Sequence, residues 1–341
     1  MLTDIFAYRY IDVPLFSELT EPLRRLLVQG FRILNEQVQP YWINGKESEP
    51  GKIFWAALNK QLAMELGLEN LSNTHFPYTT QWQGNKNTQM HRYTCDRICS
   101  NCMSQPISGT CSVDQHLKER LSLIELGFRK KEREIEVQRI LLPATSATPL
   151  SGIQQVRGIG LRGAYDTASK KFEENVVELN TRFRQAGVKL NYHNGFIQIA
   201  QDELTQEQIE TPFWALVASN KWSNVDADMK NAVDLRDGGG RDPALYAARA
   251  LESTIKIISG EKGWTHGKEN GASNYIENLS SKKNGFIEPW EADLLKLFFS
   301  KVRNPMGHGP GDAPMPTLTA QQTQAAIEFC MSQCKNLISR L

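Results

Sequence analysis

Residues 290–309 read Trp290-Glu291-Ala292-Asp293-Leu294-Leu295-Lys296-Leu297-Phe298-Phe299-Ser300-Lys301-Val302-Arg303, followed by Asn304-Pro305-Met306-Gly307-His308-Gly309. Apolar side chains recur every three or four residues in the first part, which is the repeat of a helix with one buried face. The proline and the glycines predict that this helix ends near Arg303. Arg303 and His308 are therefore expected close together, where both side chains can reach one anion.

The surrounding C-terminal sequence predicts further helices, at 205–219, 224–235, 242–259, 288–303 and 317–341. Asp242 and Pro243 are expected to supply the N-cap and the first-turn proline of the third helix. No strand pattern interrupts the series, so an up-and-down helical bundle is predicted. Within the third helix, Glu252 lies four residues before Lys256, and it is expected either to orient Arg303 or only to pair with Lys256.

The N-terminal half also has the pattern of a helical domain. Helices are predicted at 22–34, with Thr20 as the N-cap and Pro22 in the first turn, at 53–66, ended by Gly67, and at 117–135. The mixed charges of the helix at 117–135 are expected on a solvated face. The polar run at 78–89 is read as a loop or a weak hairpin, and the sequence does not decide between them.

A small-residue stretch at 144–152 marks a boundary. A helix is predicted at 172–185, followed by a hairpin in which Asn194 and Gly195 form the turn, with His193 exposed at the strand end. The predicted fold is mainly α. An N-terminal helical domain (1–150) is followed by a connector with a helix and a short β-hairpin (151–203) and a C-terminal helical bundle (204–341).

Residues 158–163 spell G-x-G-x-x-G, the pattern of a dinucleotide-binding turn. Such a site also needs a strand before the glycines, a helix after them, and an acidic residue about 20 positions further on, at the end of a second strand. The residues at that distance lie in a helical pattern instead. A flexible loop is therefore the favoured interpretation, and no cofactor is predicted.

Cys95, Cys99, Cys102 and Cys111 are the candidates for a metal site. The spacing of the first three resembles that of iron–sulfur enzymes, and all four could hold zinc. The same spacing places the first three on one face of a helix, where cysteine is a good small core residue. Reduced core or loop cysteines are the favoured interpretation, so no metal is predicted.

Composition limits the function classes. The chain has 341 residues, of which 40% are hydrophobic and 23% charged, as in ordinary soluble proteins. Lys and Arg number 39 against 38 acidic residues, so any contact with nucleic acid must be local. No signal peptide and no apolar run of about 20 residues is present. A cytoplasmic protein without membrane contact is expected.

The pair Arg303 and His308 resembles the Arg-x4–6-His signature of the HEPN superfamily, in which a polar residue such as Asn304 commonly follows the arginine. The surrounding sequence, with Gly307 and Gly309 on either side of the histidine, is similar to that of the AbiJ-like abortive-infection branch. The helix and Asn-Gly hairpin before the bundle, and the run Ala250–Lys256 with Trp264 after it, add to the resemblance.

This resemblance implies a C-terminal HEPN-like bundle and a metal-independent endoribonuclease with a toxin-like role in anti-phage defence. Arg303, His308 and Asn304 are the implied catalytic residues, and Glu252, Lys256, Gly307 and Gly309 are the supporting ones. RNA is the implied substrate, a homodimer through the C-terminal domain is expected, and a regulatory protein or phage component is the expected trigger. The alternative is a non-catalytic HEPN module that binds a nucleotide or RNA and acts through protein partners.

Overall fold

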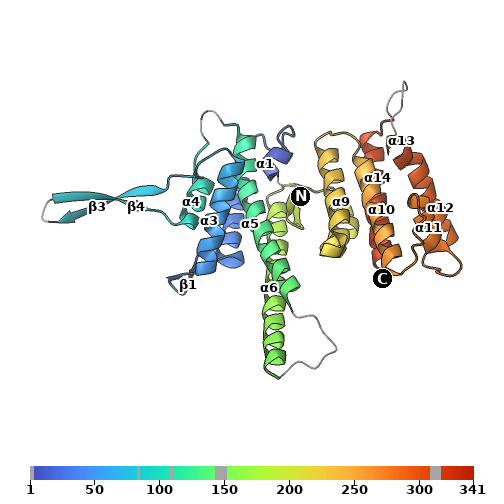
Figure 1. The fold of residues 1–341 in the computed structure, drawn as a ribbon. Coiled ribbons are helices and arrows are strands. Elements are labelled where there is room, and N and C mark those ends of the chain that lie inside the picture. The colour runs from blue at the N-terminus through green and yellow to red at the C-terminus, as the bar shows by residue number, and fades with distance from the viewer. Residues whose placement is uncertain (1–3, 83–84, 108, 110, 143–151, 308–315) are drawn as a thin grey trace. The chain divides into compact units, whose positions relative to one another are not determined.

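The computed structural model describes residues 4–82, 85–107, 109, 111–142, 152–307 and 316–341. These residues form two compact units, an N-terminal unit, Asp4–Ile199, and a C-terminal unit, Ala200–Leu341. Helices dominate both units, so the predicted mainly α fold is confirmed (Figure 1). No helix within the described residues is both long and apolar enough to cross a membrane.

The helices of the N-terminal unit include all those predicted there. They are α1 (Phe6–Arg9), α2 (Glu21–Arg32) with a π-helical extension (Ile33–Val38), α3 (Glu49–Glu65), α4 (Cys95–Ser104), α5 (Val113–Leu141) and α6 (Gly152–Gln185). Thr20 caps α2 as predicted, because its hydroxyl accepts a hydrogen bond from the Leu23 N–H. The helices α3, α5 and α6 are longer than their predicted ranges.

The strands of this unit form antiparallel hairpins. These pair β1 (Trp42–Ile43) with β2 (Lys46–Glu47), β3 (His75–Trp82) with β4 (Asn85–Arg92), and β5 (Leu190–His193) with β6 (Phe196–Ile199). The stretch at 78–89 that the sequence left undecided is therefore part of a hairpin. At the predicted Asn-Gly turn, Asn194 and Gly195 both have positive φ angles, of 43° and 87°.

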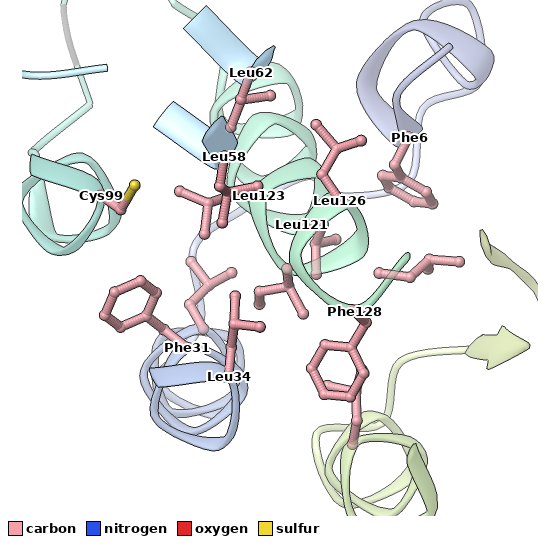
Figure 2. Close-up of a cluster of buried hydrophobic side chains, with 14 of the residues drawn as sticks. Phe6, Phe31, Leu34, Leu58, Leu62, Cys99, Leu121, Leu123, Leu126 and Phe128 are labelled. Atoms are coloured by element: carbon pink, nitrogen blue, oxygen red, sulfur yellow. The ribbon is translucent and has the colours of Figure 1, made fainter. Parts of the chain in front are cut away.

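Helix α5 is the centre of the N-terminal core, and Figure 2 shows side chains from several helices gathered around it. Between His116 and Arg129 every residue except the half-buried Glu119 is buried, including Lys118, Arg120, Glu125 and Arg129. The expectation that the charges of this helix are solvated is therefore wrong for these four residues. Neighbouring elements cover every side of the helix, so its charged groups must find partners inside the protein.

The Glu125 carboxylate is fully buried and is shared by two arginines. Oε1 accepts hydrogen bonds from Arg9 Nη1 at 3.0 Å and from Arg129 Nη2 at 2.6 Å. Oε2 accepts from Arg9 Nη2 at 2.7 Å and from the Ile197 N–H at 2.8 Å. The arginines also donate to the carbonyls of Ile197 and Gly195, at 2.7 and 2.6 Å. One carboxylate thereby ties α1 and the β5–β6 hairpin to α5.

This network explains a difference from the predicted domain division. Residues 151–203 were expected to form a separate connector, whereas the unit boundary lies at residue 200 and α6 and the hairpin belong to the N-terminal unit. Phe172, Leu179 and Phe183 of α6 lie in its core. His193, expected to be exposed, is buried, because the hairpin packs against α5 instead of reaching into solvent.

The G-x-G-x-x-G stretch at 158–163 lies inside α6. A dinucleotide-binding turn requires these glycines in a loop between a strand and a helix, so that their backbone can approach a pyrophosphate. The favoured interpretation as a flexible loop was also wrong, because the three glycines are tolerated within a 34-residue helix. The motif therefore supplies no cofactor site in this chain.

The C-terminal unit is helical throughout its described residues. Its elements are α7 (Glu203–Thr205), η2 (Gln206–Glu210), α8 (Thr211–Val217), η3 (Asn220–Trp222), α9 (Ser223–Asp237), α10 (Pro243–Glu261), α11 (Ala272–Ser280), α12 (Pro289–Phe298), η4 (Phe299–Arg303), α13 (Asn304–Gly307) and α14 (Ala320–Ile338). Helix α11 was not predicted. It is short and contributes only Ile276 and Leu279 to the buried residues.

Helix α10 is the central element of this unit and packs against α9, α11 and α14. On this helix Ala248, Leu251, Ile255 and Ile258 are fully buried, whereas Leu245 is half-buried. The helix begins at Pro243 as predicted, but Asp242 makes no capping hydrogen bond. The backbone of Asp242 is in the left-handed region, with φ of 58°, and its carboxylate instead pairs with Arg241 at 3.0 Å.

Replacing Glu125 by glutamine should lower the free energy of unfolding of the N-terminal unit by about 3–5 kcal/mol, because Arg9 and Arg129 then remain buried without their anion. Urea unfolding of the full chain, followed by circular dichroism, measures the change. Glu136→Gln is the matched control on the same helix. It removes a partly exposed pair with Arg139 at 2.6 Å, and it should cost less than about 1 kcal/mol. Equal losses in both variants would contradict the role assigned to Glu125.

Candidate functional site

The segment that carries the Arg-x4-His pattern is helical as far as Gly307. Helix α12 passes into the π-helical segment η4 and then into α13, which contains Pro305. The prediction that the helix ends at Arg303 is therefore wrong. A proline inside an α-helix lacks an N–H donor, and its ring collides with the carbonyl four residues earlier. The wider π turn just before Pro305 relieves this conflict, and it places Arg303 at the junction of the two helical forms.

The Arg303 guanidinium lies against α10. Nη2 donates to Glu252 Oε2 at 3.4 Å, and Nη1 donates to Asn304 Oδ1, also at 3.4 Å. Both hydrogen bonds are long for a guanidinium. The third donor, Nε, is buried and has no hydrogen-bond partner in the part of the chain that the structure describes. Arg303 is thus held in place, but its donors are only partly used.

Glu252 has a second cation beside it. Its Oε1 lies 2.7 Å from Lys256 Nζ, one turn further along α10. Glu252 therefore contacts Arg303 as well as Lys256, so it does not pair with Lys256 alone. The Glu252 side chain is 13% exposed, compared with 46% for Lys256, so the carboxylate lies inside the site and the ammonium group at its edge.

A pocket of about 510 Å³ opens between α9, α10 and η4. Its lining residues are Asn224, Ala227, Asp228, Arg249, Glu252, Ser253, Lys256 and Arg303. Arg249 Nη2 lies 3.2 Å from Asp228 Oδ1. Burial raises the pKa of Asp228, although the nearby Arg249 favours its ionised form. Three cations and two carboxylates give this lining a formal charge of +1 (3 − 2 = +1).

The residues that follow Arg303 fix the segment to the bundle. Met306 is buried with Ala244 of α10 and Ala326 of α14. Gly307 lies beside the arginine, since a Cβ atom built there would be 3.4 Å from Arg303 Nη1. His308 and Gly309 lie outside the described residues. Of the predicted site, the structure brings together Arg303, Asn304, Glu252, Lys256 and Gly307.

Sequence reasoning missed the contribution of α9. Asn224 and Asp228 are four residues apart and lie on one face of that helix. Polar residues at this spacing are common on solvated helix faces, so they carry no functional signal alone. Arg249 of α10 was not predicted as a site residue either. Its pairing with Asp228 is what joins the two helices here.

The cysteines do not form a metal centre among the residues that are described, where no group of three or more His, Cys, Asp or Glu side chains is arranged to hold an ion. Cys99 and Cys102 are buried in the N-terminal core from helix α4, and burial raises the pKa of both thiols. Cys95 packs against the same core. The structure therefore shows the cysteines of this helix packed in or against the core.

Phe298 and Phe299 both face the helical bundle. Phe299 is buried, and the ring centroid of Phe298 lies 4.7 Å from that of Phe329 in α14. The exposed apolar residues of α12 are Trp290, Leu294 and Leu297, with 66%, 39% and 56% of their surface accessible. Spacings of four and three residues place them on one face of the helix.

Comparison with family models matches residues 4–215 to the family described as AbiJ N-terminal domain 4. The match spans more than half of the chain, covers the described N-terminal unit, and continues into α8. No curated protein and no solved structure matches the chain.

Proposed function

The chain belongs to the abortive-infection family described as AbiJ N-terminal domain 4, and we propose that its C-terminal unit is a metal-independent endoribonuclease used in anti-phage defence. The proposal rests on the surroundings of the Arg303 side chain. Its guanidinium lies at a pocket with a positive lining, its Nε is buried without a described partner, and Gly307 beside it directly precedes His308.

RNA phosphate is the anion that this pocket suits. A guanidinium presents its donors in a plane that matches two phosphate oxygens. Arg249 and Lys256 are about half exposed at the same pocket, so they can contact neighbouring phosphates of a bound strand. Glu252 keeps the Arg303 side chain against α10, and it thereby presents the remaining donors to the substrate.

The proposed reaction is an internal transfer at phosphorus. His308 removes the proton of the ribose 2′-hydroxyl, and the 2′-oxygen then bonds to phosphorus while the bond from phosphorus to the 5′-oxygen breaks. A general acid protonates the leaving 5′-oxygen. Arg303 stabilises the negative charge that develops on the phosphate oxygens, and Asn304 positions one of them or His308. The products are a 2′,3′-cyclic phosphate and a 5′-hydroxyl.

This reaction needs a base and an acid on opposite sides of the phosphate, whereas each chain carries one Arg303–His308 pair. A second copy of the chain, related by two-fold symmetry, supplies the other pair. The exposed face of Trp290, Leu294 and Leu297 on α12 is the proposed contact surface, because this helix leads directly into η4 and Arg303. The N-terminal unit is proposed to sense the trigger or restrain the nuclease.

The wild-type chain should cut RNA in the presence of EDTA. Arg303→Ala and His308→Ala should each reduce the cleavage rate by about 100-fold or more, as when an oxyanion-binding donor or a general base is lost. Glu252→Gln should cause a smaller loss, since the guanidinium remains but is held less firmly. Gel analysis of structured and unstructured RNA measures these rates.

Glu277→Gln is the matched control, because Glu277 pairs with Lys296 at 2.9 Å in the same unit but away from the pocket. It should cut at the wild-type rate. An unchanged rate in His308→Ala would contradict the mechanism. Tight RNA or nucleotide binding without cleavage by the wild-type chain would instead support the non-catalytic module, which the existing pairing of Arg303 with Glu252 also permits.

A mixture of Arg303→Ala and His308→Ala chains should recover part of the cleavage that each variant has lost, if the site is shared between two copies. The mixed dimer then contains one intact arginine and one intact histidine at a common site. Cleavage assays on mixtures that have been dissociated and reassembled measure this. A mixture that forms dimers but remains inactive would show that the site is not shared.

The contact surface itself is tested with Leu297→Glu, which should yield monomers by light scattering after size exclusion and should lose cleavage. The matched control is Ile53→Glu, which alters an apolar helix residue of the other unit that is 68% exposed. It should leave the dimer intact. A Leu297→Glu chain that remains dimeric would exclude α12 as the interface.

A further inference from the structure

The β3–β4 hairpin is built differently from the other long hairpin of the N-terminal unit. Every residue of β5 and β6 is buried or half-buried. By contrast, residues 77–81 and 86–92 are all exposed. Within its own unit, the β3–β4 ribbon extends away from the helices (Figure 1). An isolated two-stranded ribbon is only marginally stable in water. Packing against the core therefore does not explain why this ribbon extends over eight residue pairs.

The register assigns the side chains to two faces. Directly opposed residues share a face, which pairs Phe76 with His91 and Tyr78 with Gln89 on one side of the ribbon. The rings on this face form a row. Phe76 stacks on Tyr93 at 4.5 Å between ring centroids, and Tyr78 meets His91 edge-on at 5.1 Å. Tyr78 is 52% exposed, so part of its ring is open to a ligand.

The charge of the ribbon has one sign. From Asn70 to Cys95 the sequence contains no aspartate or glutamate, although acidic and basic residues are balanced in the whole chain. Lys86 and Arg92 are exposed permanent cations on the face opposite the rings. A two-stranded ribbon is narrow, since paired strands lie only about 5 Å apart, so the long side chains of Lys86 and Arg92 can reach phosphates that run along its edge.

These features fit a nucleic acid better than a protein. The strands contain no valine, isoleucine or leucine, which an apolar protein interface would use, and Pro77 interrupts the donors along β3. Exposed aromatic rings beside cations and amide side chains are what proteins use to hold single strands, because every base can stack on a ring. A base in a duplex is already stacked and cannot do so.

We propose that the β3–β4 ribbon is a binding arm for single-stranded nucleic acid, in which bases stack on Tyr78 and His91 while Lys86 and Arg92 attract the phosphates. The arm is a second binding site, in the N-terminal unit, and it does not depend on the proposed nuclease activity. It provides the unit with a direct way to detect unpaired strands.

Fluorescence anisotropy with fluorescein-labelled 20-residue oligouridylate and oligothymidylate tests the proposal. The full chain carries His308→Ala so that the probe stays whole. Adding Tyr78→Ala with His91→Ala should weaken binding by about tenfold or more. Met90→Ala, which alters an exposed residue on the opposite face of the same ribbon, should bind like the parent chain. Lys86→Gln with Arg92→Gln should reduce the salt dependence of binding.

Equal affinity for the RNA and DNA probes would indicate that the arm contacts only bases and phosphates. A higher affinity for the RNA probe would indicate an additional contact with the ribose 2′-hydroxyl. A chain in which a glycine–serine linker replaces residues 76–91 should keep its melting temperature and bind both probes about tenfold or more weakly than the parent chain. Undiminished binding by that chain, or a loss confined to Arg303→Ala, would overturn the proposal. Binding by the arm without any RNA cleavage would instead count against the nuclease alone.

Discussion

A carboxylate held between two cations occurs in both units, and in the N-terminal unit it is the polar interaction on which the packing of the fold depends. Glu125 takes this role in the N-terminal unit, where it is fully buried and all its partners lie within 3.0 Å. Because the network is closed to solvent and includes a backbone N–H of the hairpin, it holds α1 and the β5–β6 hairpin against α5. Removing a charge from it leaves the others buried without compensation.

Glu252 repeats the arrangement in the C-terminal unit, but there it is incomplete. Its contact with Arg303 is 3.4 Å long, and the arginine retains a buried donor without a described partner. The same kind of carboxylate–arginine contact is therefore fully enclosed in the N-terminal unit and borders a pocket in the C-terminal unit. Pro305 contributes to this difference, because the π turn that accommodates it sets the position of Arg303 relative to α10.

Local sequence signals predicted much of the fold. Thr20, Gly67 and the Asn194–Gly195 turn act on the chain within a few residues, Thr20 through a side-chain hydrogen bond and the others through positive φ angles, and each lies where it was expected. The contact of Glu252 with Arg303, 51 positions away, was anticipated only as one of two readings. The charges of α5 and the residues of α9 were misjudged, because burial depends on which elements cover a helix. The continuation of the helix past Pro305 was missed for a similar reason, since packing of Met306 favours it.

The most direct test of the nuclease account is the role of the ribose 2′-hydroxyl. An RNA is mapped for its cleavage site and then synthesised with a single 2′-deoxynucleotide on the 5′ side of that bond. The account predicts that this substrate resists cleavage there, and that the unmodified RNA yields a 2′,3′-cyclic phosphate and a 5′-hydroxyl by mass spectrometry. Cleavage of the deoxy substrate at the same bond, or products with a 5′-phosphate, would contradict it.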